Sequence, residues 1–129
     1  MALILADTDV LIDYLAGTQP VADEKATYIQ SDQLATSAVS CFELLVGARE
    51  GKRGDAVRRL VRRIPVVAVD RQAAVEAAQV RRQLAERGFT IGMADSLIAG
   101  TAIACDFPLV TRNRKHFERI ENLRLLPGS

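Results

Sequence analysis

The sequence is poor in the residue types that build several kinds of functional centre. Its 129 residues include no tryptophan, two cysteines and one histidine. The cysteines, Cys41 and Cys105, have neither a CxxC spacing nor histidines near them, which excludes a zinc site and a disulfide framework. Both lie in apolar helical patterns, so we expect buried, inert thiols.

Long hydrophobic runs are also missing. No apolar stretch approaches the roughly 20 residues that a membrane-spanning helix requires, and residues 1–5 lack the basic flank of a signal peptide. We therefore predict a cytoplasmic protein without a membrane partner. Hydrophobic residues make up 49% of the chain, which suits a single domain, residues 1–129, with a core of its own.

Charge is distributed unevenly along the chain, although the net charge is only +1. Residues 1–48 hold seven acidic residues and one lysine, whereas the remainder holds 16 basic and nine acidic residues. A basic second half, mostly arginine, offers the positive surface that a nucleic acid requires. Tyrosines occur only at positions 14 and 28, so we expect few side chains for stacking single-stranded bases.

Short apolar runs alternate with helical patterns. This alternation predicts an α/β protein, a three-layer sandwich with a short, mainly parallel sheet flanked by helices. The predicted strands cover residues 2–6, 34–36, 66–69, 107–111 and 123–126, and the predicted helices cover 10–15, 20–30, 40–51, 55–63, 71–87 and 93–105.

Carboxylates stand at the boundaries of these elements. Asp7 follows the first predicted strand, Glu43 lies near the start of the helix predicted from Ser40, and Asp95 lies in the first turn of helix 93–105. Ligands of open α/β sheets bind outside the carboxyl ends of the strands, where Asp7 and residues 111–113 would meet. Carboxylates gathered there need a compensating cation, and their hard oxygen atoms suit Mg²⁺ or Mn²⁺.

Each of these acids also has an ordinary structural role open to it. Asp7 could cap the following helix. The spacing Ser40-x-x-Glu43 matches a capping box, in which the glutamate only reaches back to a backbone amide. Asp95 could simply compensate the dipole of its helix.

Four other polar residues near these acids are weaker candidates for the predicted metal site. Thr111 and Asn113 follow a predicted strand and could be turn residues. Asp9 and Asp13 fall on other faces of the first predicted helix, so we expect them to be solvated at the surface.

Four motifs follow one another along the chain. They are Leu5-Ala-Asp7-Thr-Asp9-Val-Leu-Ile, Ser40-x-x-Glu43-Leu-x-x-Gly47, Ala94-Asp95-Ser-Leu-Ile-Ala and Thr111-Arg-Asn113-Arg-Lys-His116-Phe117. Each motif is weak alone, but their joint order and spacing are specific. In these motifs, over essentially its whole length, the chain resembles the PIN-domain nucleases, and within them the VapC toxins of prokaryotic toxin–antitoxin pairs.

The resemblance implies a site and an activity. Asp7, Glu43 and Asp95 would be catalytic acids that hold Mg²⁺ or Mn²⁺, and Thr111 and Asn113 would be supporting polar groups. The implied activity is hydrolysis of phosphodiester bonds in a structured RNA such as tRNA or rRNA, by a water that the metal activates. The implied partners are an inhibitory antitoxin and a second copy of the chain, in a homodimer. Four basic residues stand beside this proposed site in the sequence, Arg112, Arg114, Lys115 and Arg119, and the first three are the candidates for RNA binding.

One position departs from the family pattern. The family often has a fourth acid three residues after Asn113, where this chain has His116. Neutral imidazole is itself a metal ligand, so His116 is a candidate for the metal site. The other interpretation places it on the surface beside Arg114 and Lys115. Asp9 also stands where the family more often has asparagine.

Two other functions fit parts of the same pattern. Residues 4–11 also resemble the first motif of the haloacid-dehalogenase phosphatases, in which Asp7 would be a covalent nucleophile. Thr111 and Lys115 would then supply the second and third motifs, but only Glu118 and Glu121 follow to form the paired-acid metal site. The remaining alternative is a non-catalytic PIN-like binding module.

Overall fold

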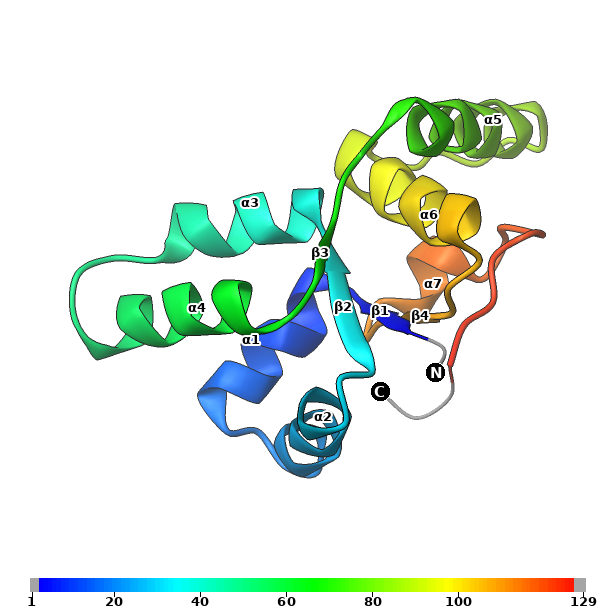
Figure 1. Cartoon of the computed structure of the whole chain (residues 1–129). Helices are drawn as coiled ribbons and strands as arrows, with labels where there is room; N and C mark the ends of the chain where they lie inside the picture. Colours follow the sequence, from blue (N-terminus) through cyan, green and yellow to red (C-terminus); the bar gives the residue numbers. More distant parts are fainter. Residues whose placement is uncertain (1–2, 127–129) are drawn as a thin grey trace.

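The computed structural model describes residues 3–126, which form four strands and seven helices. The strands β1 (Ile4–Ala6), β2 (Leu34–Ser37), β3 (Val66–Val67) and β4 (Leu109–Val110) form one sheet in the order β3-β2-β1-β4, and all pairs are parallel. Figure 1 shows helices packed on both sides of this sheet. The predicted α/β sandwich with a parallel sheet is confirmed.

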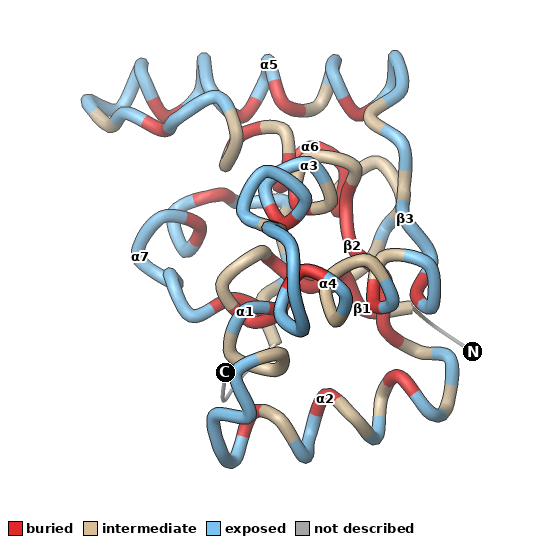
Figure 2. The backbone as a smooth tube through the Cα atoms, turned by 90° about the vertical axis from the view of Figure 1, so that its left-hand side faces the viewer, coloured by how far each residue is buried: buried red, intermediate tan, exposed pale blue. Residues whose placement is uncertain are grey.

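Two hydrophobic cores lie on the two faces of the sheet. Successive residues of a strand point to opposite faces, so Ile4 and Ala6 pack in one core and Leu5 packs in the other. Figure 2 shows buried residues along the strands and on the inward faces of the helices. The first core includes residues of α1 (Thr8–Ala16), α2 (Val21–Gln30), α3 (Ala38–Gly47) and α4 (Lys52–Arg63), and the second includes residues of α5 (Arg71–Glu86), α6 (Met93–Cys105) and α7 (Arg114–Phe117).

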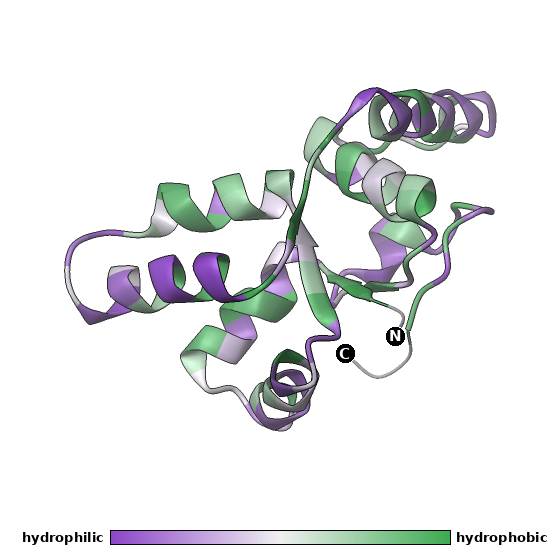
Figure 3. Cartoon of the chain, in the orientation of Figure 1, coloured by the Kyte–Doolittle hydropathy of each residue, from purple (hydrophilic) through white to green (hydrophobic). Residues whose placement is uncertain are grey.

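Helix α6 is apolar along most of its length because it lies between α5 and the sheet. Figure 3 shows this helix in hydrophobic colours, whereas α4 and α5 carry strongly hydrophilic faces. None of the helices within residues 3–126 is both long and apolar enough to cross a membrane.

The predicted bounds of α3 and α4 are wrong. Ser37, not Ser40, caps α3, because the Ser37 hydroxyl accepts the Ser40 N–H at 3.1 Å. The helix therefore begins at Ala38, and it ends at Gly47 rather than at residue 51. Helix α4 begins at residue 52 instead of 55.

The carboxyl-terminal quarter differs most from the prediction. Residues 123–126 do not form the predicted strand. In the described part of the chain this segment makes one parallel bridge, between Leu125 and Leu109 of β4. Residues 114–117 form the short helix α7, which the sequence pattern did not predict. The predicted strand 107–111 shortens to two residues, and the predicted start at Ala2 lies outside the described residues.

The two cysteines are less buried than expected. Cys41 and Cys105 are both partly exposed. Burial and the nearby Asp70 carboxylate raise the pKa of the Cys105 thiol, so this thiol stays protonated at neutral pH and is a poor nucleophile.

Candidate active site

Asp7 lies at the carboxyl end of β1 with both carboxylate oxygens hydrogen-bonded. Oδ1 accepts the N–H of Thr8 at 2.8 Å, which makes Asp7 the cap of α1, and Oδ2 accepts the Thr111 hydroxyl at 2.8 Å. The residue is only 4% exposed. Burial raises the pKa of Asp7 to about 6, with repulsion from Asp9 and Asp95 adding to the effect and the hydrogen bonds opposing it. Asp7 is therefore both a helix cap and a carboxylate with raised proton affinity.

Thr111 reaches Asp7 from the neighbouring strand. It follows β4, which pairs with β1 in parallel, so the carboxyl ends of both strands meet at one edge. The Thr111 oxygen accepts the Asn113 N–H at 3.0 Å, which directs the hydroxyl hydrogen toward Asp7. The predicted support from Thr111 thus has a direct contact, whereas Asn113 contributes through its main chain.

Glu43 projects from α3 toward the start of α1. Its Oε1 accepts the Thr8 hydroxyl at 2.7 Å, and that hydroxyl oxygen also lies 2.9 Å from Ser40 Oγ. The capping-box interpretation is wrong, because Ser37 caps the helix and Glu43 lies a further turn along it. Thr8 is a contact that sequence reasoning missed; its position directly after Asp7, at the first residue of α1, is the available signal.

Asp9 and Asp13 are not solvated surface residues, contrary to the prediction. The backbone N–H of Arg112 donates to Asp9 Oδ2 at 3.1 Å, and Arg112 Nε lies 3.0 Å from Oδ2 of Asp13, whose side chain is 13% exposed. Burial raises the pKa of Asp9. Its other oxygen, Oδ1, is buried without a hydrogen-bond partner among the described residues. Asp9 therefore lies near Asp7, where the carboxyl ends of β1 and β4 meet. We call this edge of the sheet, with the acids around it, the acidic edge.

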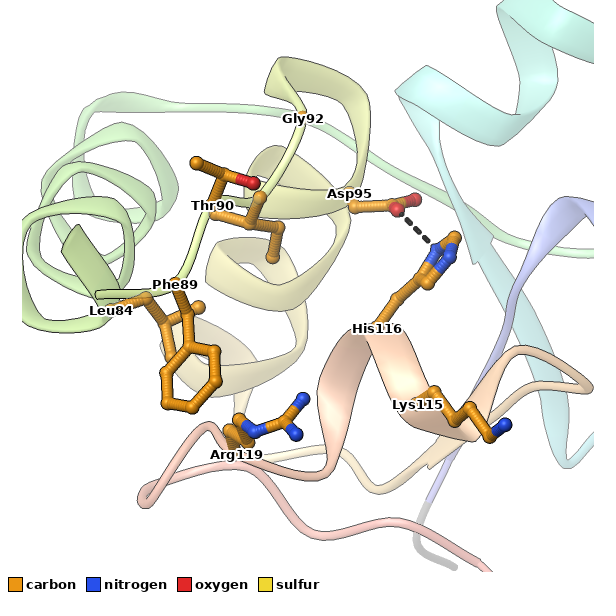
Figure 4. A pocket seen from close by; sticks show the side chains of 9 residues that line it. Leu84, Phe89, Thr90, Gly92, Asp95, Lys115, His116 and Arg119 are labelled. Atoms are coloured by element: carbon orange, nitrogen blue, oxygen red, sulfur yellow. Dashed lines mark hydrogen bonds and ion pairs between the residues drawn. The ribbon is translucent and has the colours of Figure 1, made fainter. Parts of the chain in front are cut away.

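Asp95 and His116 meet between α6 and α7. Asp95 Oδ2 lies 2.9 Å from His116 Nδ1, and Figure 4 marks this interaction with a dashed line. The Asp95 side chain is 29% exposed and that of His116 is 57% exposed. His116 is thus a surface residue that also contacts one of the three predicted acids.

The three basic candidates have different surroundings. Arg112 is paired with Asp13, and Arg114 donates from Nη1 to the Leu126 carbonyl at 2.7 Å. Lys115 lines a cavity next to Asp95. The structure therefore places Arg112 beside an acid of this edge and Lys115 in the lining of the cavity next to Asp95, whereas the recorded contact of Arg114 is with the carboxyl-terminal segment.

The donor chemistry of this edge fits a hard divalent cation. Within residues 3–126 no three His, Cys, Asp or Glu side chains converge closely enough to form a metal cage. Mg²⁺ does not need one, because it keeps several waters and binds through one or two carboxylates. Two observations support the fit: the buried Asp9 Oδ1 has no hydrogen-bond partner in the part of the chain that the structure describes, and repulsion from Asp9 and Asp95 adds to the raised pKa of Asp7.

Comparisons with known proteins show the family and the fold to which the chain is similar. The family model described as PIN domain matches residues 4–123. The chain is 34% identical to "Ribonuclease VapC1" of Methanocaldococcus jannaschii over 122 residues, which cover 95% of this chain and 84% of that protein. It is 29% identical to "tRNA(fMet)-specific endonuclease VapC" of Shigella flexneri, with 96% of each chain covered. The crystal structure of DNA-bound VapBC from Salmonella typhimurium matches with a TM-score of 0.81 and 28% identity over 98% of each chain.

Proposed function

Because the chain belongs to the PIN-domain family, we propose that it is a metal-dependent endoribonuclease toxin that a cognate antitoxin inhibits. The observation that carries this proposal is Asp7, buried at a strand end, hydrogen-bonded through both oxygens and electrostatically coupled to Asp9 and Asp95. The relatives named ribonuclease and tRNA endonuclease support RNA as the substrate. The whole chain, residues 1–129, is proposed as one nuclease domain, since both cores share one sheet. Because the chain belongs to the PIN-domain family, we do not propose the phosphatase alternative.

The proposed mechanism uses the residues of the acidic edge as follows. A bound Mg²⁺ or Mn²⁺ would lower the pKa of a water and neutralise charge on the phosphodiester. Asp7 accepts a hydrogen bond from Thr111 and Asp95 contacts His116, and in the proposed mechanism these two carboxylates would hold the ion. Glu43 would supply a third carboxylate from α3. The RNA strand would be held along the edge by the nearby basic residues Arg112, Arg114 and Lys115.

Cleavage assays with the purified chain, free of antitoxin, test the activity. With Mg²⁺ or Mn²⁺ we expect cuts at discrete positions in tRNA or rRNA, and no cuts when a chelator is added. Mn²⁺ titration by calorimetry separates the alternatives, because a non-catalytic binding module need not bind the metal. If the chain neither cuts these RNAs nor binds Mn²⁺, the nuclease proposal is wrong.

Thr8→Val is expected to slow cleavage about 10- to 100-fold with little loss of stability, because a small displacement of a catalytic group costs up to this much. Valine has a similar shape but lacks the hydroxyl that contacts Glu43. Loss of one hydrogen bond with an exposed partner lowers the free energy of unfolding by about 0.5–1.5 kcal/mol. Thr8→Ser is the matched control and should keep most of the activity. Equal rates for all three proteins would show that Glu43 does not depend on Thr8.

Substitutions of His116 test its contribution to the metal site. His116→Ala removes the contact with Asp95 and is expected to weaken both Mn²⁺ affinity and turnover. His116→Asp places a fourth carboxylate at this position and is expected to tighten Mn²⁺ binding, because carboxylate oxygens suit hard cations. Calorimetry and cleavage rates measure the two effects. Identical metal affinity in the three proteins would remove His116 from the proposed site.

A groove of about 430 Å³ between α1, α3 and α4 is the proposed binding site of the antitoxin. Its walls include Ile12, Leu15 and Val57, and Lys52 and Arg53 also line it. A groove of this kind suits an amphipathic partner segment with acidic flanks. Because Glu43 also lines the groove, a partner bound there would block access to the proposed acidic site.

Helix α3 and the start of α6 carry the proposed dimer surface. Phe42, Val46 and Met93 are large apolar side chains exposed on these helices, and such patches commonly mark protein contacts. Val46→Lys is expected to shift the chain from dimer to monomer in light scattering, with an unchanged melting temperature for the monomer fold because Val46 is not in the core. A wild-type chain that is monomeric at high micromolar concentration would contradict the dimer.

A further inference from the structure

A cavity of about 340 Å³ lies directly beside Asp95 (Figure 4). Leu84 and Ile91, both buried, give it an apolar floor, and Phe89 forms part of one wall. Helix α7 contributes His116 to the lining, and Arg119, shortly after this helix, lies next to Phe89. The cavity therefore has one apolar side and one polar side, and it opens next to a proposed metal-binding acid.

Phe89 and Arg119 form a stacked pair within this cavity. The Arg119 guanidinium carbon lies 4.1 Å from the centroid of the Phe89 ring. Arg87 also lies over this ring, at 5.7 Å, and donates to the Arg119 carbonyl at 2.9 Å. Aromatic rings and guanidinium planes are the surfaces on which unstacked RNA bases pack. The expectation of few stacking side chains rested on the two tyrosines and left out this phenylalanine.

The charges around the cavity favour a ligand that carries phosphate. Arg119 and the imidazole of His116 line the cavity together with a single carboxylate, Asp95; Lys115 also lines it, with its ammonium group pointing outward (Figure 4). An isolated phosphate would not need the apolar floor, and an apolar peptide would not need the cations. A nucleotide uses both features, because it combines an apolar, flat base with an anionic phosphate.

We propose that this cavity holds one unstacked nucleotide of the RNA substrate beside the phosphodiester that is cut, with its base packed against Arg119 and Phe89. This inference rests on the proposed endoribonuclease function and adds to it a position for one base of the substrate. A base can enter the cavity only after it leaves the RNA stack.

The test combines protein variants with modified RNA. The variants are Arg119→Gln and Phe89→Leu, and the matched control is Arg82→Gln, which removes an equal charge from an exposed position of α5. The probe is a synthetic hairpin RNA in which each loop nucleotide is made abasic in turn. Binding is measured by fluorescence anisotropy without divalent metal, and cleavage is measured with Mn²⁺.

One loop position should behave differently from the others. An abasic nucleotide there should weaken binding to the wild-type chain on the order of 10- to 100-fold, the range that loss of one stacked base gives. Arg119→Gln should weaken binding of intact RNA to a similar extent, and the same abasic change should have no further effect on that variant. In cleavage the loss should appear in KM more than in kcat. Arg82→Gln should stay within about twofold of wild type, as independent surface sites do.

The results that would contradict nucleotide binding in the cavity differ from those that would contradict the proposed endoribonuclease activity. Equal sensitivity of wild type and Arg119→Gln to every abasic position would show that the cavity holds no base. Unchanged RNA binding with a weakened antitoxin complex would assign the cavity to the antitoxin and overturn the inference. A chain that cuts no RNA, yet shows the coupling in binding, would contradict the proposed activity while supporting the nucleotide site.

Discussion

Asp7→Asn is expected to abolish RNA cleavage, with a loss of at least about 10³-fold, because a metal ion supplies several kcal/mol of transition-state stabilisation. Asparagine keeps an oxygen for the Thr8 N–H but removes the negative charge that would hold the cation. Cleavage rates with Mn²⁺ measure the loss. Glu50→Gln, which neutralises an exposed acid between α3 and α4, is the control and should cut at the wild-type rate. Comparable activity in Asp7→Asn would remove Asp7 from the mechanism.

The same substitution is expected to stabilise the metal-free protein at neutral and alkaline pH. The pKa of Asp7 is raised from 3.8 to about 6 in the folded chain, mainly by burial. Between these values the folded chain binds more protons than the unfolded chain, so stability falls as the pH rises from about 4 through 6. A pKa shift of this size lowers the free energy of unfolding by roughly 3 kcal/mol at a pH well above 6. Asparagine does not ionise, so the variant avoids this loss.

Thermal melting in the presence of a chelator measures this difference in stability. In Asp7→Asn the Thr111 hydroxyl loses a good acceptor at every pH. At pH 8 removal of the buried charge outweighs this loss, so the variant should melt above wild type. At pH 4 wild-type Asp7 is protonated, so the difference should vanish or reverse. Addition of Mn²⁺ should raise the melting temperature of wild type at pH 8 but not that of the variant. A variant that melts below wild type at both pH values would contradict the assigned pKa shift.

Local patterns in the sequence predicted much of the fold because the sheet is parallel and buried on both faces. Strands of this kind read as continuous apolar runs, so β1 and β2 were recognised and Asp7 was placed at a strand end. The cap of α3 was misassigned because Ser37 and Ser40 both suit a cap. Which serine caps the helix depends on where β2 ends. Strand β2 continues through Ser37 because Ser37 pairs with Val67 of the neighbouring strand β3.

The remaining features of the site depend on contacts between distant segments. Asp9 lies at the acidic edge because the Arg112 N–H, 103 residues away, donates to its carboxylate. His116 contacts Asp95 because α7 packs beside α6, and α7 has only four residues, too few for a helical repeat to be seen. Resemblance to a family supplied Asp7, Glu43 and Asp95, but their hydrogen-bond partners became visible only in the structure.

Gly100→Val is expected to lower the free energy of unfolding by more than about 3 kcal/mol, a large part of the 5–15 kcal/mol that a domain of this size has. A Cβ atom at Gly100 would lie 2.5 Å from the Ala73 carbonyl oxygen and 2.6 Å from the Ala77 nitrogen. Both atoms belong to the backbone of α5, so no flexible side chain can move aside. To accept the substitution, α5 and α6 must separate and open the core between them.

Gly100→Ala separates the effect on stability from the effect on function. Alanine favours the helix by about 1 kcal/mol over glycine, whereas overpacking costs about 1–3 kcal/mol, so we expect a folded protein that is less stable in urea. Because α6 carries Asp95 in its first turn, a shifted helix should also cut RNA more slowly. Gly47→Ala in α3 is the matched control, since its Cβ would meet no atom within 4 Å. It should be as stable as wild type or slightly more stable. If Gly100→Ala matches wild type in both unfolding and cleavage, the close approach of α5 to α6 neither limits stability nor positions Asp95.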